Sequence, residues 1–392
     1  MTQQTYAVSE NVRIEIRNCH NRVTVNGGED ARTVVANGSA RQDGDTLVFE
    51  NMNKVLVRVP RTATVCITDC DADVRVDDLA GRVEIVRVDG DLALRNLRGE
   101  TVVGQVDGDL AIKNVSTLQG QGVWNGDVAI RETSIAKLET LDGDLSVWGN
   151  RELLVVKEID GDVNLREMNG RVIINHIGGD LIASEFKGGL EVADIRGDAI
   201  VSLVQAAEVK MVAKGDIVLR LPENIDADIE LDAPHGDLIA RHDIQVIEED
   251  EQHLRGTIGN GGIKIQVEST HGDLILEGQQ PMRHLHFARM GQEIAEQVHA
   301  SLGDVPRGHV IAEQVRESVR ASLGDWKRHG RHRVIIRKRH HPDEEETVFE
   351  EPIEETPPKP TLTSAERQAI LDAIARGELS VDDAIKKLRG EM

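Results

Sequence analysis

The dipeptide Gly-Asp recurs along this chain at nearly constant spacing, and that spacing restricts the fold more than any other feature. The regular copies begin at Gly90, Gly108, Gly126, Gly143, Gly161, Gly179, Gly197 and Gly215. Two looser copies follow at Gly236-Asp237 and Gly272-Asp273. A short fixed period, here of about 18 residues, predicts a stack of equivalent structural units in place of an ordinary globular core.

Each period consists of two half-repeats, in which apolar residues flank a single position of any type. That alternation is the period of a β-strand. Gly beside Asp or Asn is expected to form the turn, because these residues tolerate positive φ. The pattern predicts an all-β parallel β-solenoid with one coil per period and inward-facing Leu, Val and Ile. A propeller blade needs roughly 40 or more residues, and a sandwich would not keep so constant a spacing. The hand of the coil cannot be read from the pattern.

Composition and periodicity divide the chain into six segments. They are 1–80, N-terminal strands and a cap; 81–280, the regular solenoid; 281–325, amphipathic helices; 326–341, a basic segment; 342–361, an acidic proline-rich linker; and 362–392, a helical hairpin.

Residues 284–302 and 308–323 carry apolar residues at three- and four-residue steps, as one face of a helix does. In the first of these segments the apolar residues are Phe287, Met290, Ile294, Val298 and Leu302. Both segments contain Ala-Glu-Gln-Val and lead to Ser-Leu-Gly-Asp, which indicates a duplicated helix. Two interpretations remain open: a cap over the last coil, or a seam for self-association.

The last segment, 362–392, has the pattern of two short helices. Thr363-Ser-Ala-Glu366 is a capping box, and Gly377 ends the first helix. About thirty residues are too few for much of a core, so such a hairpin is expected to complete itself against a partner or a second copy. The predicted contact residues are Ile370, Ile374, Ile385 and Leu388. The chain is therefore predicted to be a homo-oligomer through 284–323, 362–392 or both.

The basic segment is a candidate partner-binding site. Its Lys and Arg residues are Lys327, Arg328, Arg331, Arg333, Arg337, Lys338 and Arg339. It is predicted to bind the acidic run Asp343–Glu355 of the same chain. The alternatives are docking on anionic membrane lipid, with Trp326 and Val334–Ile336 inserting, and nucleic-acid binding. The net charge of −23 makes nucleic acid the least favoured of these partners.

The repeated aspartates are the candidate metal site. Stacking the coils aligns Asp91, Asp109, Asp127, Asp144, Asp162, Asp180, Asp198 and Asp216 in a ladder. Neighbouring carboxylates at about 5 Å repel by roughly 1 kcal/mol in water, and calcium bridging adjacent coils would relieve that repulsion. The calcium-binding pattern Gly-Gly-x-Gly-x-Asp is absent. The favoured interpretation is that each Asp caps backbone N–H groups in its own turn and stays solvated.

The remaining composition predicts neither catalysis nor a cofactor. Aromatic residues make up 2% of the chain, too few for carbohydrate stacking, and no coil carries a distinct cluster of Asp, Arg, Lys and His. Three cysteines form no disulfide framework, and Cys66 with Cys70 has no matching pair for zinc. The start of the chain has no signal-peptide pattern. No apolar stretch approaches the roughly 18 residues that a membrane span requires. A cytoplasmic protein is expected, with a membrane-peripheral location as the alternative.

Two parts of the chain resemble known families. Val55–Pro60, Ala63–Thr68 and the Gly-Asp coils resemble the bacterial adhesin-like β-solenoid domain of unknown function, over residues 10–278. Glu366–Ala384 resembles the SHOCT-like helical hairpin that often accompanies that domain. The resemblance implies a non-enzymatic scaffold with a hairpin for oligomerisation or docking, and no catalytic residues. The alternatives are a membrane-peripheral adaptor in cell-envelope stress or regulation, and a carbohydrate-active β-helix enzyme.

Overall fold

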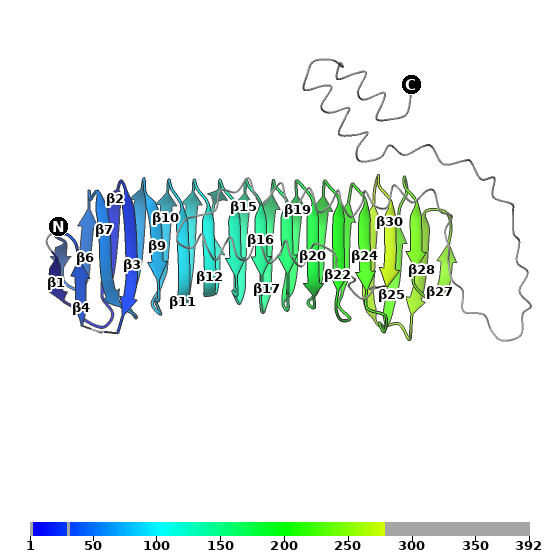
Figure 1. Ribbon diagram of the computed structural model, residues 1–392, viewed down its shortest axis with the longest axis horizontal. Helices are drawn as coiled ribbons and strands as arrows, with labels where there is room; N and C mark the ends of the chain where they lie inside the picture. The colour runs from blue at the N-terminus through cyan, green and yellow to red at the C-terminus, as the bar shows by residue number, and fades with distance from the viewer. Residues whose placement is uncertain (1–2, 30–31, 279–392) are drawn as a thin grey trace, which may run out of the picture. The chain divides into compact units, whose positions relative to one another are not determined.

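The computed structural model describes residues 3–29 and 32–278, and these residues form thirty β-strands and no helix (Figure 1). Nearly all strands pair in parallel with a strand one period away. Val83, for example, pairs with Val65 of the preceding coil on one side and with Thr101 of the following coil on the other. The described part of the chain is thus all-β and solenoid-like, which confirms the predicted strand class. The predicted helices lie outside the described residues, and no described helix could cross a membrane.

The strands form two walls that share one hydrophobic core. In spatial order, the first wall consists of β6 (Thr46–Glu50), β2 (Arg13–Cys19), β8 (Thr64–Cys70), β10 (Val83–Val88), the second half of β11 (Leu92–Val106), the second half of β12 (Leu110–Gly120) with β13 (Val123–Trp124), β15 (Ile135–Leu141), β17 (Leu153–Ile159), β19 (Arg171–Ile177), β21 (Leu190–Ile195), β23 (Val209–Ala213), β29 (Ile263–Ser269) and β25 (Ala227–Asp232).

The second wall is built from the other half of each coil. In spatial order it consists of β7 (Lys54–Pro60), β3 (Arg22–Gly28), β9 (Asp73–Asp77), the first half of β11, the first half of β12, β14 (Val128–Arg131), β16 (Leu145–Trp148), β18 (Val163–Arg166), β20 (Leu181–Phe186), β22 (Ala199–Leu203), β24 (Ile217–Leu221), β30 (Leu274–Gly278) and β26 (Leu238–Arg241).

The core lies between the walls and is filled by the apolar residues that alternate along each strand. In β16, Leu145 and Val147 are 0% and 1% exposed, and Ser146 between them points outward. The alternation repeats in every coil, so one continuous cluster of buried side chains runs from Val12 to Leu276. Burying these side chains in contact with those of the coils above and below stabilises the stack.

The coils at both ends are stacked out of sequence order. β2 pairs with β6 on one side and β8 on the other, so the 13–28 coil lies between the 46–60 and 64–77 coils. At the other end, β29 pairs with β23 and β25, so the 263–278 coil lies between 209–221 and 227–241. At the N-terminal end the outermost parallel coil is 46–60, which follows the 13–28 coil in sequence. At the other end it is 227–241, which precedes the 263–278 coil in sequence.

Antiparallel strands extend three of the four edges of the two walls, and among the described residues no strand pairs with the outer edge of β26. At the N-terminal end, β5 (Arg41–Asp43) pairs with β6, β4 (Thr33–Ala36) with β7, and β1 (Gln4–Ala7) with β4. At the other end, β28 (His253–Ile258) pairs with β25 and β27 (Gln245–Glu249) with β28. Exposed Glu248 and Glu249 make the outermost edge acidic. Charged, short edge strands block further strand pairing.

Candidate functional site

The repeated aspartates form a hydrogen-bonded ladder at the corner where the first wall turns into the second. In each step the backbone N–H of one aspartate donates to Oδ1 of the aspartate in the adjoining coil, at 2.7–3.3 Å. The members, in spatial order, are Asp73, Asp91, Asp109, Asp127, Asp144, Asp162, Asp180, Asp198, Asp216, Asp273 and Asp237. All eight predicted aspartates belong to the ladder. The aspartates of the two looser Gly-Asp copies belong to it as well, but Asp273 precedes Asp237 in the spatial order.

The geometry modifies the expected role of these carboxylates. Each one caps an N–H of the neighbouring coil, where the sequence suggested an N–H of its own turn. The corner also closes around them, since Asp144 is 8% exposed and Asp162 is 4% exposed. Among the described residues, no group of three or more His, Cys, Asp or Glu side chains is arranged to hold a metal ion. Calcium binding by the ladder stays a prediction.

The glycines of the repeat have a steric role. None of them has positive φ, so the expectation that they supply left-handed turns was wrong. A Cβ on Gly108 would lie 2.5 Å from the carbonyl oxygen of Gly90, and a Cβ on Gly126 2.4 Å from that of Gly108. Glycine is needed because the backbones of adjoining coils touch at this corner.

Among the described residues, six of the nine non-glycine residues with positive φ occupy the opposite corner, six positions after the repeat glycine of their coil or its equivalent. Asp78, Asn96, Asn114, Glu132, Glu167 and Glu185 have φ between 52° and 62°. The amide of Asn96 donates to Asp78 at 2.8 Å, and the amide of Asn114 donates to Asn96 at 2.9 Å. Asn and Asp are the side-chain-bearing residues that adopt this conformation at least cost. Asp78, Asn96 and Asn114 recur at this fixed offset in three consecutive coils, a signal that the sequence analysis missed, whereas Glu132, Glu167 and Glu185 occupy the same position without that preference.

A row of basic residues and one tryptophan runs along the outer side of the second wall, and we call it the basic row. Its members pair in register coil after coil: Arg95, Lys113, Arg131, Trp148 and Arg166. The Arg131 guanidinium lies 4.1 Å from the centroid of the Trp148 ring, and that of Arg166 lies 5.9 Å from it. Cations over an aromatic face attract its quadrupole. Burial lowers the pKa of both Arg95 and Arg131.

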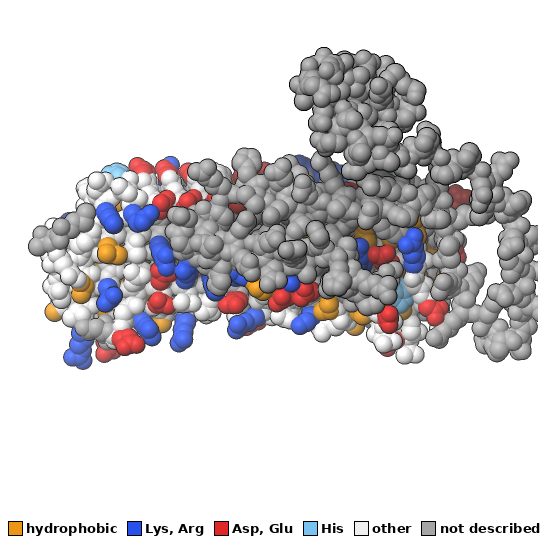
Figure 2. All heavy atoms as spheres, in the orientation of Figure 1, with side chains coloured by type: hydrophobic (Ala, Val, Ile, Leu, Met, Phe, Trp, Pro, Cys, Tyr) orange, Lys and Arg blue, Asp and Glu red, His pale blue; other side chains and the backbone are white. Residues whose placement is uncertain are grey.

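The basic row itself contains no acidic residue, although Arg166 forms ion pairs with Glu185 and Glu167 beside it. Figure 2 shows basic and acidic side chains intermingled over the described part of the face in view. A single-sign row on a chain of charge −23 is a local exception. Because local potential governs encounter with charged partners, such a row favours an acidic one. The row lies five positions after each repeat glycine, an offset that the sequence analysis did not inspect.

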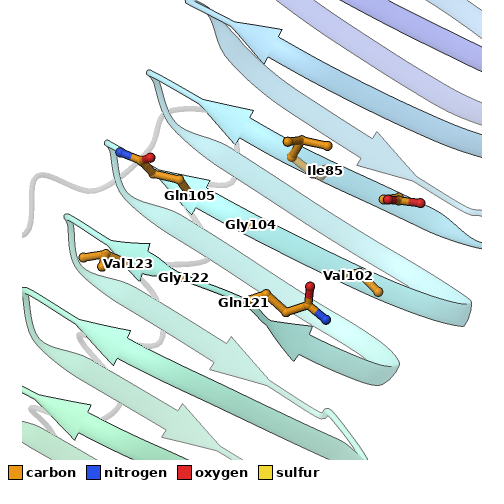
Figure 3. Close-up of a pocket in the computed structure, with 9 residues that line it drawn as sticks. Ile85, Val102, Gly104, Gln105, Gln121, Gly122 and Val123 are labelled. Carbon is orange, nitrogen blue, oxygen red and sulfur yellow. The ribbon is translucent and has the colours of Figure 1, made fainter.

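A hollow of about 550 Å³ opens on the outer side of the first wall (Figure 3). It forms where Gly104 and Gly122 contribute no side chains, with Gln105, Gln121 and Val123 around them. The indole N–H of buried Trp124 donates to the Gly104 carbonyl at 2.7 Å and fixes the strand beneath. Of the described residues that line the hollow, Glu84 is the one ionisable residue. The hollow offers no pair of groups for acid–base chemistry.

Two of the three cysteines meet in the N-terminal coils. Cys19 of β2 and Cys70 of β8 are register partners on adjacent strands, and both are buried. A hydrogen bond between the thiols lowers the pKa of Cys19 and, together with burial, raises that of Cys70. The sequence placed Cys66 with Cys70 because they are close in the chain. The out-of-order stacking of β2 instead brings Cys19 to Cys70, although several strands separate them in the sequence.

The predicted partner-binding residues, which lie between 327 and 388, fall outside the described residues. The basic segment and the hairpin stripe therefore stay predictions. The same holds for the helices of 281–325, and for docking on lipid.

Three comparisons place the chain among known proteins. The family model described as Toastrack DUF4097 matches residues 3–277, nearly the whole described range. No curated protein matches. A solved structure from Clostridium sporogenes, described as "a putative cell adhesion protein", aligns with 71% of this chain and 99% of its own length. Its identity is 10% and its TM-score 0.15, values too low to support an argument about function.

Proposed function

Because this chain belongs to the Toastrack DUF4097 family, we propose that it is a non-enzymatic, adhesin-like scaffold that binds partners or a second copy of itself. One observation carries the proposal: the basic row keeps a cation or Trp148 at one register position over five consecutive coils. The basic row aligns four cations and Trp148 along the axis of stacking. Repeat proteins use such extended surfaces for binding, and this one suits an extended acidic partner.

The two candidate sites of the described body, the hollow and the aspartate ladder, bring no acid and base together, which supports the non-enzymatic part. A catalytic acid and base must lie within reach of one substrate atom. In the described residues, the hollow beside Gly104 has Glu84 as its only ionisable lining residue. The repeated carboxylates are engaged by backbone N–H groups of the next coil. A carbohydrate-active enzyme would need a different arrangement of these acids, with two of them facing one glycosidic bond.

We assign the self-association part to the C-terminal hairpin. Residues 362–392 hold two short apolar stripes, which include Ile370 and Ile374 on one predicted helix and Ile385 and Leu388 on the other. A structure of that length gains most of its stability from a partner surface. The described body would then act as a rigid support of fixed length, with assembly confined to the far C-terminal residues.

The test is the molar mass of the full chain by size-exclusion chromatography with light scattering. We expect an oligomer for the unaltered chain and a monomer for Ile374→Asp, which places a charge in the apolar stripe. Asp372→Asn, on the polar side of the same predicted helix, is the matched control and should leave the oligomer intact. A monomeric unaltered chain would contradict self-association, and an oligomer that survives Ile374→Asp would contradict the role of the hairpin.

A further inference from the structure

The outer side of the second wall carries a second row, two positions before the basic row, whose chemistry changes along the stack. This row occupies the position between the two inward-facing residues of each strand. From β11 to β26, in spatial order, its members are Ala93, Ala111, Ala129, Ser146, Asn164, Ile182, Ile200, Val218, Ile275 and Ile239. The first five are small or polar. The last five are large and apolar, and we call them the outer stripe.

The outer stripe points away from the main core. In β22, β24 and β30, the residues on either side of each stripe member belong to the core between the walls. Because side chains alternate along a strand, Ile200, Val218 and Ile275 face outward. They form a hydrophobic cluster of their own, with Ile239 packed against it. The second wall therefore has an apolar layer on both of its sides at this end of the stack.

The side chains of this outward cluster are closed to solvent. Ile200 and Ile275 are each 4% exposed, and Val218 is 1% exposed. The first wall offers a comparison, since outward-facing Val155 and Ile173 are also register partners but remain partly exposed. Among the described residues, Ile239 is the one further hydrophobic side chain packed on the cluster. The outer stripe has the burial of an inner packing layer, and the described residues supply no outer layer of hydrophobic side chains.

The continuation of the chain fits this face in position and in length. The described chain ends at Gly278, three residues after Ile275 of the stripe. Nine further residues, which can span up to about 30 Å when extended, lead to Phe287. From Phe287 to Leu302 the apolar face of the predicted helix is about 22 Å long at 1.5 Å per residue. The five members of the outer stripe lie on adjoining strands, so four inter-strand spacings of about 4.8 Å give the stripe a length of about 19 Å.

We propose that residues 284–302 dock with their apolar face on the outer stripe of the same molecule, parallel to the axis of stacking. The short connection from Gly278 gives this segment a high effective concentration at its own stripe, which favours it over the same segment of a second copy. The helix then completes the second wall from outside. It covers the outer side of the second wall and not the end of the first wall, where β28 and β27 already pair. This assignment does not rest on the proposed scaffold function.

Photo-crosslinking in the full chain tests the contact directly. Ile239 is partly exposed, so Ile239→p-benzoylphenylalanine keeps the fold while placing a reactive ketone at the stripe. A mixture of unlabelled and nitrogen-15-labelled chains is irradiated, digested and analysed by mass spectrometry. We expect peptides from 284–302 joined to the β26 peptide, with both halves carrying the same isotope. The matched control, Ile173→p-benzoylphenylalanine, lies outward on the first wall and should not capture that segment.

The other outcomes overturn the proposal. Mixed-isotope products would make the stripe an interface between copies, and capture of another segment would assign the face elsewhere. Absence of any product at Ile239 would mean that nothing covers the stripe. A second readout uses trypsin: Val298→Glu should speed cleavage after Arg289 by about tenfold or more, because docking suppresses local opening. Gln292→Glu, on the polar side of the predicted helix, should leave that rate unchanged. Equal rates in the two variants would also refute docking.

Discussion

The aspartate ladder predicts that one carboxylate oxygen stabilises the stack as a hydrogen-bond acceptor, independently of its charge. Oδ1 of Asp162 accepts the backbone N–H of Asp180 at 2.8 Å, in a corner where Asp162 is 4% exposed. Asp162→Asn and Asp162→Ala both remove the charge, so both relieve repulsion from the neighbouring carboxylates equally. Only Asp162→Ala removes the acceptor. Leaving a partly buried N–H without its acceptor costs about 1–3 kcal/mol, which is the expected difference between the two variants.

The assay is urea unfolding followed by circular dichroism, with the free energies compared at equal denaturant dependence. Asp160 provides the matched control, because it lies two residues earlier in the same coil and is exposed. Asp160→Asn and Asp160→Ala should agree within about 0.5 kcal/mol, as expected for surface substitutions. If Asp162→Ala proves as stable as Asp162→Asn, the ladder bond contributes nothing measurable and the argument for its role fails.

Three further predictions concern the corner glycines, one ion pair and the thiols. Gly108→Ala should lower the free energy of unfolding by about 2 kcal/mol or more, measured by the same urea assay, because its Cβ would lie 2.5 Å from the Gly90 carbonyl oxygen. The hydrogen bond to Asp232 raises the pKa of His253, so this pair stabilises the fold fully at lower pH and loses its contribution as pH rises through the folded-state pKa. The melting temperatures of His253→Gln and the unaltered protein should therefore converge as the pH is raised. Maleimide should label Cys66 first in the native protein, by mass spectrometry, and prior labelling of either buried cysteine would contradict the described core.

The sequence pattern was sufficient to predict the strands because the residues that define the period are apolar side chains that all face the core. Leu92 and Leu94 stack on Leu110 and Ile112 in the predicted register, one period along the chain. Each pair is buried, so the alternation that marks them is enforced in every coil. The role of the repeat glycines could not be read in the same way. A contact between backbones of adjoining coils leaves no pattern that distinguishes it from a left-handed turn.

The spatial order of the coils at the ends of the stack could not be predicted from local sequence. Gly236-Asp237 and Gly272-Asp273 are equivalent in local sequence, yet the backbone N–H of Asp273 donates to Oδ1 of Asp216, and that of Asp237 donates to Oδ1 of Asp273. The choice depends on β28, which pairs antiparallel with β25 and needs that strand at the edge. Such a choice is made by tertiary pairing and leaves no trace in local propensity.

The sequence analysis missed the basic row and the outer stripe for a related reason. The sequence analysis searched for residues of one type, and it found the aspartates. The basic row mixes Arg, Lys and Trp, and the row that contains the outer stripe begins as alanine and ends as isoleucine. Only the register of the strands brings these residues into lines. Once the register is known, both rows can be read at fixed offsets of three and five positions from each repeat glycine.

The threading of the end coils determines the order in which a growing chain can fold. A nascent chain that ends at Arg241 already carries the 227–241 coil, but the coil that will separate it from 209–221 begins only at Ile263. During that interval Gly236-Asp237 offers Asp216 the same backbone donor that Gly272-Asp273 will later provide. Most stacked repeats can fold coil by coil as they are synthesised. Here that order would pair the 227–241 coil directly with 209–221 and exclude the coil that belongs between them. The 263–278 coil is synthesised last among the described coils but is not the last in the stack. The 209–221 and 227–241 coils must therefore remain unpaired with each other until it has been synthesised.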